Sequence, residues 1–166
     1  FHLVFGALGT YSLLKFLKQS RLSSLFGSIL FLLMPYMITM MVYGHGSQMM
    51  SAAYIPWIIL FLFKIYKKIN LFDIGIFSIL IGLQLQRGHT QIAYYTWMMI
   101  GLFSLISIIP YFMKYKFDFF TLLKAKAVLF SSLFLGFLIS FSIYLPVLNY
   151  SSLSIRGATE GGAGIQ

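Results

Sequence analysis

The 166-residue chain is 60% hydrophobic and 19% aromatic, with only 9% charged residues and a mean hydropathy of +0.90. Soluble domains carry about 25% charged residues, and a chain of this length cannot bury so many apolar side chains without exposing large apolar patches to water. The composition therefore excludes an ordinary soluble domain and predicts a membrane protein. The absence of cysteine also excludes disulfides, thiolate metal ligands and cysteine nucleophiles.

Six apolar segments follow one another along the chain, separated by charged residues or glycine. A helix needs about 20 apolar residues to cross about 30 Å of hydrocarbon, and the candidate segments are 1–16, 22–43, 49–63, 71–85, 92–112 and 122–148. They predict an all-α fold, a polytopic transmembrane bundle of about six helices over residues 1–149, in which the short first helix is truncated. Residues 150–166 then begin an extracytoplasmic loop or domain, and the chain is expected to be a fragment.

Proline occurs within or near the ends of four of these segments, at positions 35, 56, 110 and 146. Proline removes a backbone hydrogen bond and kinks helices, but it is also common in membrane helices generally. Both interpretations stay open. The serines of the last segment, at positions 131, 132, 140 and 142, are expected at helix–helix contacts because small residues let helices approach closely.

The basic residues alternate with the segments. Three follow the first segment, three follow the third and four follow the fifth, so ten of the twelve lie on one side of the membrane. Short cytoplasmic loops are enriched in Lys and Arg, which predicts that this side is cytoplasmic. Topology and contact with anionic lipids then explain the net charge of +9, and nucleic acid is not an expected partner.

Polar residues and all three histidines gather on the opposite side, namely His2 at the start of the chain, the loops GHGSQ and QLQRGHTQ with His45 and His89, and the tail YSSLSIRGATE. Arg87 has a planar fork of donors suited to a phosphate, and His89 and His45 can donate to the same anion. A solvated loop in which Arg87 reaches lipid phosphates fits the spacing equally well. Arg156 allows the same two interpretations.

The fourth segment has about 15 apolar residues, or roughly 22 Å of helix at 1.5 Å per residue. That length is too short to span the bilayer comfortably. Either the bilayer thins there, or the end that carries Gln84, Gln86, Arg87 and His89 stops below the surface and faces a water-filled cavity.

Several kinds of chemistry find no support in the sequence. The three histidines are 43 and 44 residues apart and match no local metal-ligand motif, so neither a metal nor a cofactor is predicted, although a divalent metal in a longer protein stays open. No metalloprotease, serine-hydrolase or ATPase motif is present. The middles of the segments hold no ionisable group, which disfavours an ion-coupled carrier.

Three stretches, GHGSQMMSAAYIPW, LQLQRGHTQIAYYTW and YSSLSIRG, resemble in order and spacing the YfhO family of bacterial membrane proteins. The resemblance covers essentially the whole chain and falls on Gly44, His45, Gln48, Arg87, His89, Gln91, Tyr94, Tyr95, Ser154, Arg156 and Gly157. It implies a GT-C-like bundle in the bacterial inner (plasma) membrane, related to glycosyltransferases that use polyprenyl-phosphate-linked sugars on the extracytoplasmic face. In Gram-positive members it implies sugar decoration of cell-envelope polymers such as teichoic acids.

Together, the residues and the resemblance give a hypothesis for a site. The phosphate of a polyprenyl-linked donor would be held by Arg87, His89, His45 and Arg156, with Gln48, Gln91, Tyr94 and Tyr95 in support, while the sugar passes to a cell-envelope acceptor. The catalytic carboxylate that the resemblance implies would lie in a loop ahead of Phe1, so no catalytic residue is assigned and enzyme activity of this chain stays open. The alternative is a non-catalytic, flippase-like transporter of lipid or polymer.

Overall fold

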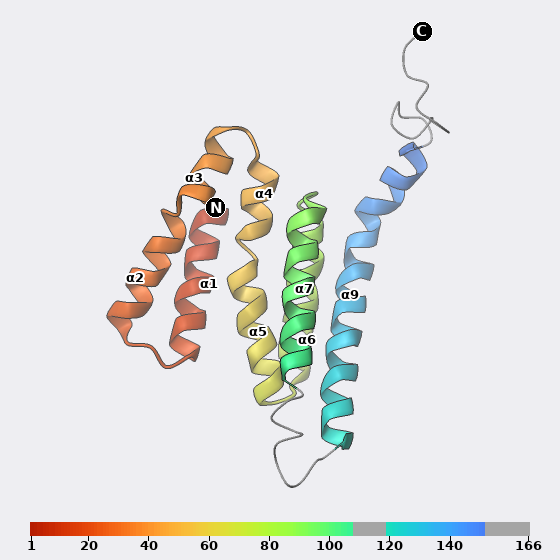
Figure 1. Ribbon diagram of the computed structural model, residues 1–166. Coiled ribbons are helices and arrows are strands. Elements are labelled where there is room, and N and C mark those ends of the chain that lie inside the picture. Colours follow the sequence, from red (N-terminus) through yellow and green to blue (C-terminus); the bar gives the residue numbers. More distant parts are fainter. Residues whose placement is uncertain (108–118, 152–166) are drawn as a thin grey trace.

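The computed structural model describes residues 1–107 and 119–151, and the regular elements within these ranges are all α-helices. The helices are α1 (His2–Phe16), α2 (Arg21–Leu32), α3 (Pro35–Val42), α4 (Gly46–Ala52), α5 (Ile55–Lys67), α6 (Leu71–Leu85), α7 (Thr90–Ile106) and α9 (Phe119–Ser151). α2 continues into α3 and α4 into α5 in the same direction, so the chain crosses the bundle in alternating directions along α1, α2–α3, α4–α5, α6, α7 and α9 (Figure 1). The predicted all-α bundle is confirmed.

Two of the six predicted segments are each divided into a pair of helices at a proline. Met34, the residue before Pro35, has the extended backbone (φ −56°, ψ 130°) that a following proline favours, so α2 ends and α3 begins at Pro35. Pro56 is the second residue of α5, directly after the break that separates α5 from α4. Pro146 instead lies inside α9. Pro110 is outside the described residues.

Within residues 1–107 and 119–151, three stretches of helix are long and apolar enough to cross a membrane, namely Arg21–Val42, Gly46–Lys67 and Lys126–Val147, each of 22 residues. The first comprises α2 and α3, and the second comprises α4 and α5. α6 is apolar but has 15 residues, the short length expected from the sequence. These helices identify the chain as a membrane protein.

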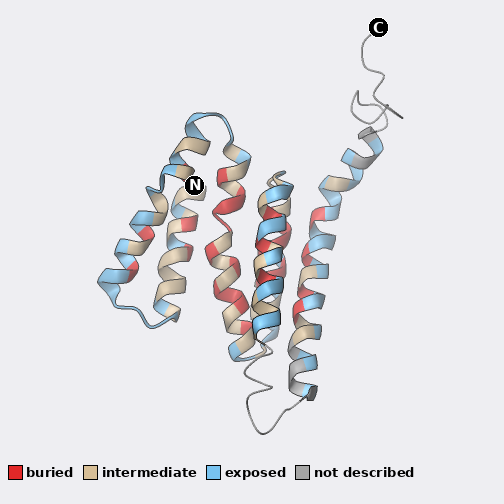
Figure 2. Ribbon diagram, viewed as in Figure 1, coloured by how far each residue is buried: buried red, intermediate tan, exposed pale blue. Residues whose placement is uncertain are grey.

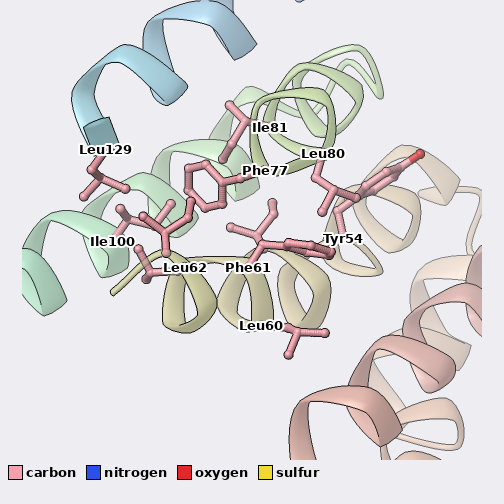
Figure 3. Close-up of a cluster of buried hydrophobic side chains, with 11 residues drawn as sticks. Tyr54, Leu60, Phe61, Leu62, Phe77, Leu80, Ile81, Ile100 and Leu129 are labelled. Atoms are coloured by element: carbon pink, nitrogen blue, oxygen red, sulfur yellow. The ribbon is translucent and has the colours of Figure 1, made fainter. Parts of the chain in front are cut away.

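The core of the bundle lies around α5 and α6. Ile58 and Leu62 of α5, Phe77 and Ile81 of α6, and Ile100 of α7 are all almost fully buried and pack together (Figure 3). α2 and α9 expose most of their residues, whereas the α4–α5 segment is largely buried (Figure 2). The exposed side chains of α2 and α9 are mainly apolar, as expected for surfaces that face lipid.

α6 and α9 approach closely through glycine. A methyl group added at Gly82 would lie 2.7 Å from Ile139 Cγ2, and one added at Gly136 would lie 2.6 Å from Ile81 Cγ2. Ser132 and Ser140 are fully buried, one helical turn before and after Gly136, which confirms them as packing positions. Ser131 and Ser142 are exposed, so the same prediction was wrong for them, because they occupy the outer face of α9.

The two ends of the bundle differ in charge. At one end, called the histidine end, lie His2, His45, Arg87 and His89, with the loops after α3 and α6 (Figure 1). At the other, called the basic end, lie Lys15, Lys18, Arg21, Lys64, Lys67, Lys68, Lys124 and Lys126. The described basic residues thus separate as predicted, and which end faces the cytoplasm stays a prediction.

Candidate functional site

Arg87 lies in the tight turn between α6 and α7. Gly88 makes this turn possible because it has a φ of +75°, which L side chains rarely adopt. The Arg87 side chain is half-buried, and its Nε donates to the carbonyl oxygen of Leu83 at 3.3 Å. A cation at the C-terminal turn of a helix is favourable. The terminal nitrogens make no hydrogen bond with the described residues, so the fork is available to an anion.

His89 caps the N-terminus of α7. Its Nδ1 accepts from the backbone N–H of Ile92 at 3.4 Å. In the neutral imidazole with Nδ1 as the acceptor, the proton is on Nε2. This cap therefore leaves His89 one N–H donor for a ligand at the same turn as Arg87.

His2 joins this end of the bundle, although the sequence did not place it in the site. Its ring lies 6.0 Å from the ring of Tyr54, the residue before α5, at the same end of the bundle as Arg87. His2 is 85 residues from Arg87 along the chain, so no local spacing could have indicated the pairing. Only the antiparallel arrangement of α1, α4–α5 and α6 brings them to one end.

His45 lies in the other loop of the histidine end. It precedes α4 without capping it, and its side chain is exposed, while Gln48 in the first turn of α4 is half-buried. Among the described residues, no hydrogen bond or ring contact links His45 to Arg87 or His89. The structure thus places Arg87 and His89 in one turn and His45 in a separate loop at the same end. Arg156 lies outside the described residues.

The other predicted supporting residues form their own group along α7. Gln91 Nε2 donates to the hydroxyl of Tyr95 at 2.8 Å, and the rings of Tyr94 and Tyr95 lie 5.9 Å apart. Both tyrosines are more than half exposed. This arrangement fits aromatic side chains at a membrane–water interface and does not direct them toward Arg87.

Gln84 is the polar residue whose environment differs most from the expectation. It is fully buried between α4, α6 and α7, and its Nε2 donates to the carbonyl oxygen of Ser51 at 3.1 Å and to Thr96 Oγ1 at 3.0 Å. The carbonyl of Ser51 lies at the break between α4 and α5, where it accepts from Tyr54 N in a poorer 3.3 Å bond. The amide of Gln84 therefore bonds the carbonyl group at the helix break. Of the two explanations for the short fourth segment, the water-filled cavity does not apply to this residue, because it is fully buried.

Acidic and metal-binding groups are scarce in the part of the chain that the structure describes. No three of its His, Asp and Glu side chains come together as metal ligands. Asp73 lies at the basic end, 3.7 Å from Lys64. No carboxylate among the described residues therefore reaches Arg87 or His89.

Comparison with known proteins leaves the site to be judged on its geometry, since no family model, curated protein or solved structure matches this chain. The geometry brings an available guanidinium fork and an imidazole donor together in one turn, and the other two histidines lie at the same end of the bundle. Donors of this kind bind phosphate and other oxyanions.

Proposed function

We propose that this chain is part of an integral membrane glycosyltransferase-like protein, which transfers sugar from a polyprenyl-phosphate-linked donor to a cell-envelope acceptor. The donor phosphate binds at the histidine end, which faces the extracytoplasmic side of a bacterial inner membrane. One observation carries the proposal. Arg87 stands apart from the other described Lys and Arg side chains, and its terminal nitrogens are unbonded in the described structure.

The chemistry follows from where charge develops during transfer. An acceptor hydroxyl attacks the anomeric carbon of the sugar while the bond to the lipid-linked phosphate breaks, so negative charge grows on the departing phosphate. Donors fixed in advance at that position lower the barrier. Arg87 supplies a charged fork and His89 an Nε2–H to these oxygens, and His45 lies in a separate loop at the same end. Arg156 stays a candidate from the sequence, outside the described residues.

The same site supports a second candidate, a non-catalytic transporter that captures lipid phosphates. Deprotonating the acceptor hydroxyl requires a general base, and the carboxylate of Asp73 pairs with Lys64 at the basic end. The described residues thus supply phosphate donors without a base beside them. This observation favours the transporter, because a transferase would need a carboxylate from outside the described residues.

A transfer assay separates these candidates. The purified protein in lipid nanodiscs is given a polyprenyl-phosphate-linked sugar and a hydroxyl acceptor, and wild type is compared with Arg87→Ala and His89→Ala. Losing a charge-assisted hydrogen bond costs about 1.5–3 kcal/mol, so Arg87→Ala should lower kcat/KM about 10- to 100-fold.

The control is Arg21→Ala, which removes the same charge at the basic end and should leave the rate unchanged. Equal rates for wild type, Arg87→Ala and His89→Ala would refute the site. Arg87-dependent movement of the lipid across vesicles without sugar transfer would instead support the transporter.

A further inference from the structure

A groove runs between α7 and α9. Both helices pack against α6, but they make almost no direct backbone contact with each other. Three cavities of about 290, 290 and 330 Å³ lie between them, and Trp97 is in the wall of all three. Phe137 is shared by the first and second cavities, and Phe130 and Leu133 by the second and third. The cavities are thus neighbours along the two helices, and together they are called the α7/α9 groove.

The close contact of α9 with α6 keeps this groove open. Ile139 and the carbonyl oxygen of Gly136 lie where a side chain at position 82 would begin, so α9 is seated as near to α6 as a helix can come. A side chain at Gly101 of α7, by contrast, would meet nothing within 4 Å. α9 therefore packs on α6 and leaves space beside Gly101 of α7.

The wall of the groove is apolar along its length, with polar groups at its ends. Its middle is lined by Trp97, Phe130, Leu133, Phe134 and Phe137. Phe130 and Phe134 are 72% and 54% exposed, which is favourable only against hydrocarbon. At the histidine end the hydroxyl of Tyr144 is already bonded to the carbonyl oxygen of Leu85 at 3.1 Å.

The basic end of the groove carries a positive charge. Lys126 lines the last cavity, and its Nζ donates to the hydroxyls of Tyr66 and Ser107, at 2.8 and 2.7 Å, and to the carbonyl oxygen of Ser104. These partners are neutral, and they hold the ammonium at the C-terminal turn of α7. All three N–H groups of Lys126 are thus used within the bundle. Within the described ranges no carboxylate pairs with Lys126, so its positive charge stays uncompensated and attracts an anion without a direct hydrogen bond.

We infer that the α7/α9 groove binds an anionic phospholipid, with one acyl chain along Trp97 and the phosphate beside Lys126. The groove extends along α7 from Thr90 to Ser104, about 21 Å at 1.5 Å per residue. One leaflet contributes about 15 Å of hydrocarbon, so an acyl chain fits within this length. The site is independent of the donor site proposed above, because its charge lies at the opposite end of the bundle.

A membrane helix from another protein fits the groove less well. A helix is a rigid cylinder about 10 Å wide with its side chains. The groove instead consists of three small cavities of about 290, 290 and 330 Å³, which a flexible acyl chain can follow.

Quenching of Trp97 fluorescence by brominated phospholipids tests the inference. Trp57→Phe leaves Trp97 as the tryptophan of this chain, and bromine on the acyl chains quenches an indole that it touches. We expect strong quenching in this background. Gly101→Leu, which fills the groove, should remove most of it, while Gly75→Leu should not, because it adds the same side chain to open space on α6.

The headgroup is tested with brominated phosphatidylglycerol and phosphatidylcholine. One lysine near a phosphate should favour the anionic lipid about five-fold, and Lys126→Gln should remove this preference while Lys18→Gln retains it. Equal quenching by both lipids in wild type would overturn the headgroup assignment. Weak quenching that Gly101→Leu does not change would overturn the groove as a lipid site. If the protein is instead a dimer in which Trp97 is protected from bromine, the groove binds a second copy of this chain.

Discussion

Alanine at Gly82 or Gly136 is expected to loosen the contact between α6 and α9. The new methyl group at Gly82 would lie 2.9 Å from the carbonyl oxygen of Gly136, and the one at Gly136 would lie 2.8 Å from the carbonyl oxygen of Ser78. These oxygens belong to the helix backbones, so a rotamer change cannot relieve the clash. α9 would have to move away from α6 as a unit, and overpacking of this kind costs about 1–3 kcal/mol.

The steric cost of the added methyl group can be separated from the helix propensity of alanine, because the same bundle has helical glycines with free space around them. Replacing Gly by Ala inside a helix gains up to about 1 kcal/mol from propensity alone. Gly75→Ala and Gly101→Ala should show this gain, since an added methyl group meets nothing within 4 Å at either position. Gly82→Ala should combine the gain with the clash. The difference between Gly82→Ala and Gly75→Ala in the free energy of unfolding is therefore about 1–3 kcal/mol.

The measurement is an SDS titration of the purified protein in mixed micelles, followed by tryptophan fluorescence. Gly82→Ala and Gly136→Ala should unfold at lower SDS than Gly75→Ala and Gly101→Ala. If all four variants have the same free energy of unfolding, α9 does not pack on α6 as described, and the α7/α9 groove loses its basis.

Three further outcomes follow from single contacts. Gln84→Met keeps the volume but loses the donor to the α4–α5 break, and should cost about 1 kcal/mol of unfolding free energy; an unchanged value would mean that the break needs no partner. Trp57→Phe should cost a similar amount, about 1 kcal/mol, because Trp57 Nε1 donates to the Phe5 carbonyl at 2.8 Å, and equal stability would argue against α1 being anchored there. The chain has no cysteine, so a membrane-impermeant maleimide should label Ser47→Cys on intact cells and Lys68→Cys only after permeabilisation; the opposite pattern would invert the topology.

The architecture could be predicted largely from the sequence, because lipid imposes simple rules. Apolar segments and the alternation of basic residues predicted the helices and the two ends, and α6 has the predicted bounds of residues 71–85. Proline could not be interpreted in advance. Pro35 and Pro56 begin new helices while Pro146 lies within one, and that choice depends on what surrounds each break.

The candidate site was less predictable because it depends on contacts between distant segments. Nothing near Gln84 in the sequence indicates that its amide bonds the carbonyl oxygen of Ser51, 33 residues away, so the sequence left open whether this side chain faces water. His2 likewise reaches the vicinity of Arg87 only in the folded bundle. Gln91 and Tyr95, in contrast, are one helical turn apart and bond to each other, which their spacing permits.

Binding of a polyprenyl phosphate to the protein in nanodiscs tests the central proposal most directly. The account predicts that Arg87→Ala raises the Kd about 10- to 100-fold, the equivalent of one lost charge-assisted hydrogen bond. Arg21→Ala, at the basic end, should bind like wild type. An unchanged Kd for Arg87→Ala, or an equal loss for both variants, would contradict a phosphate site at the histidine end.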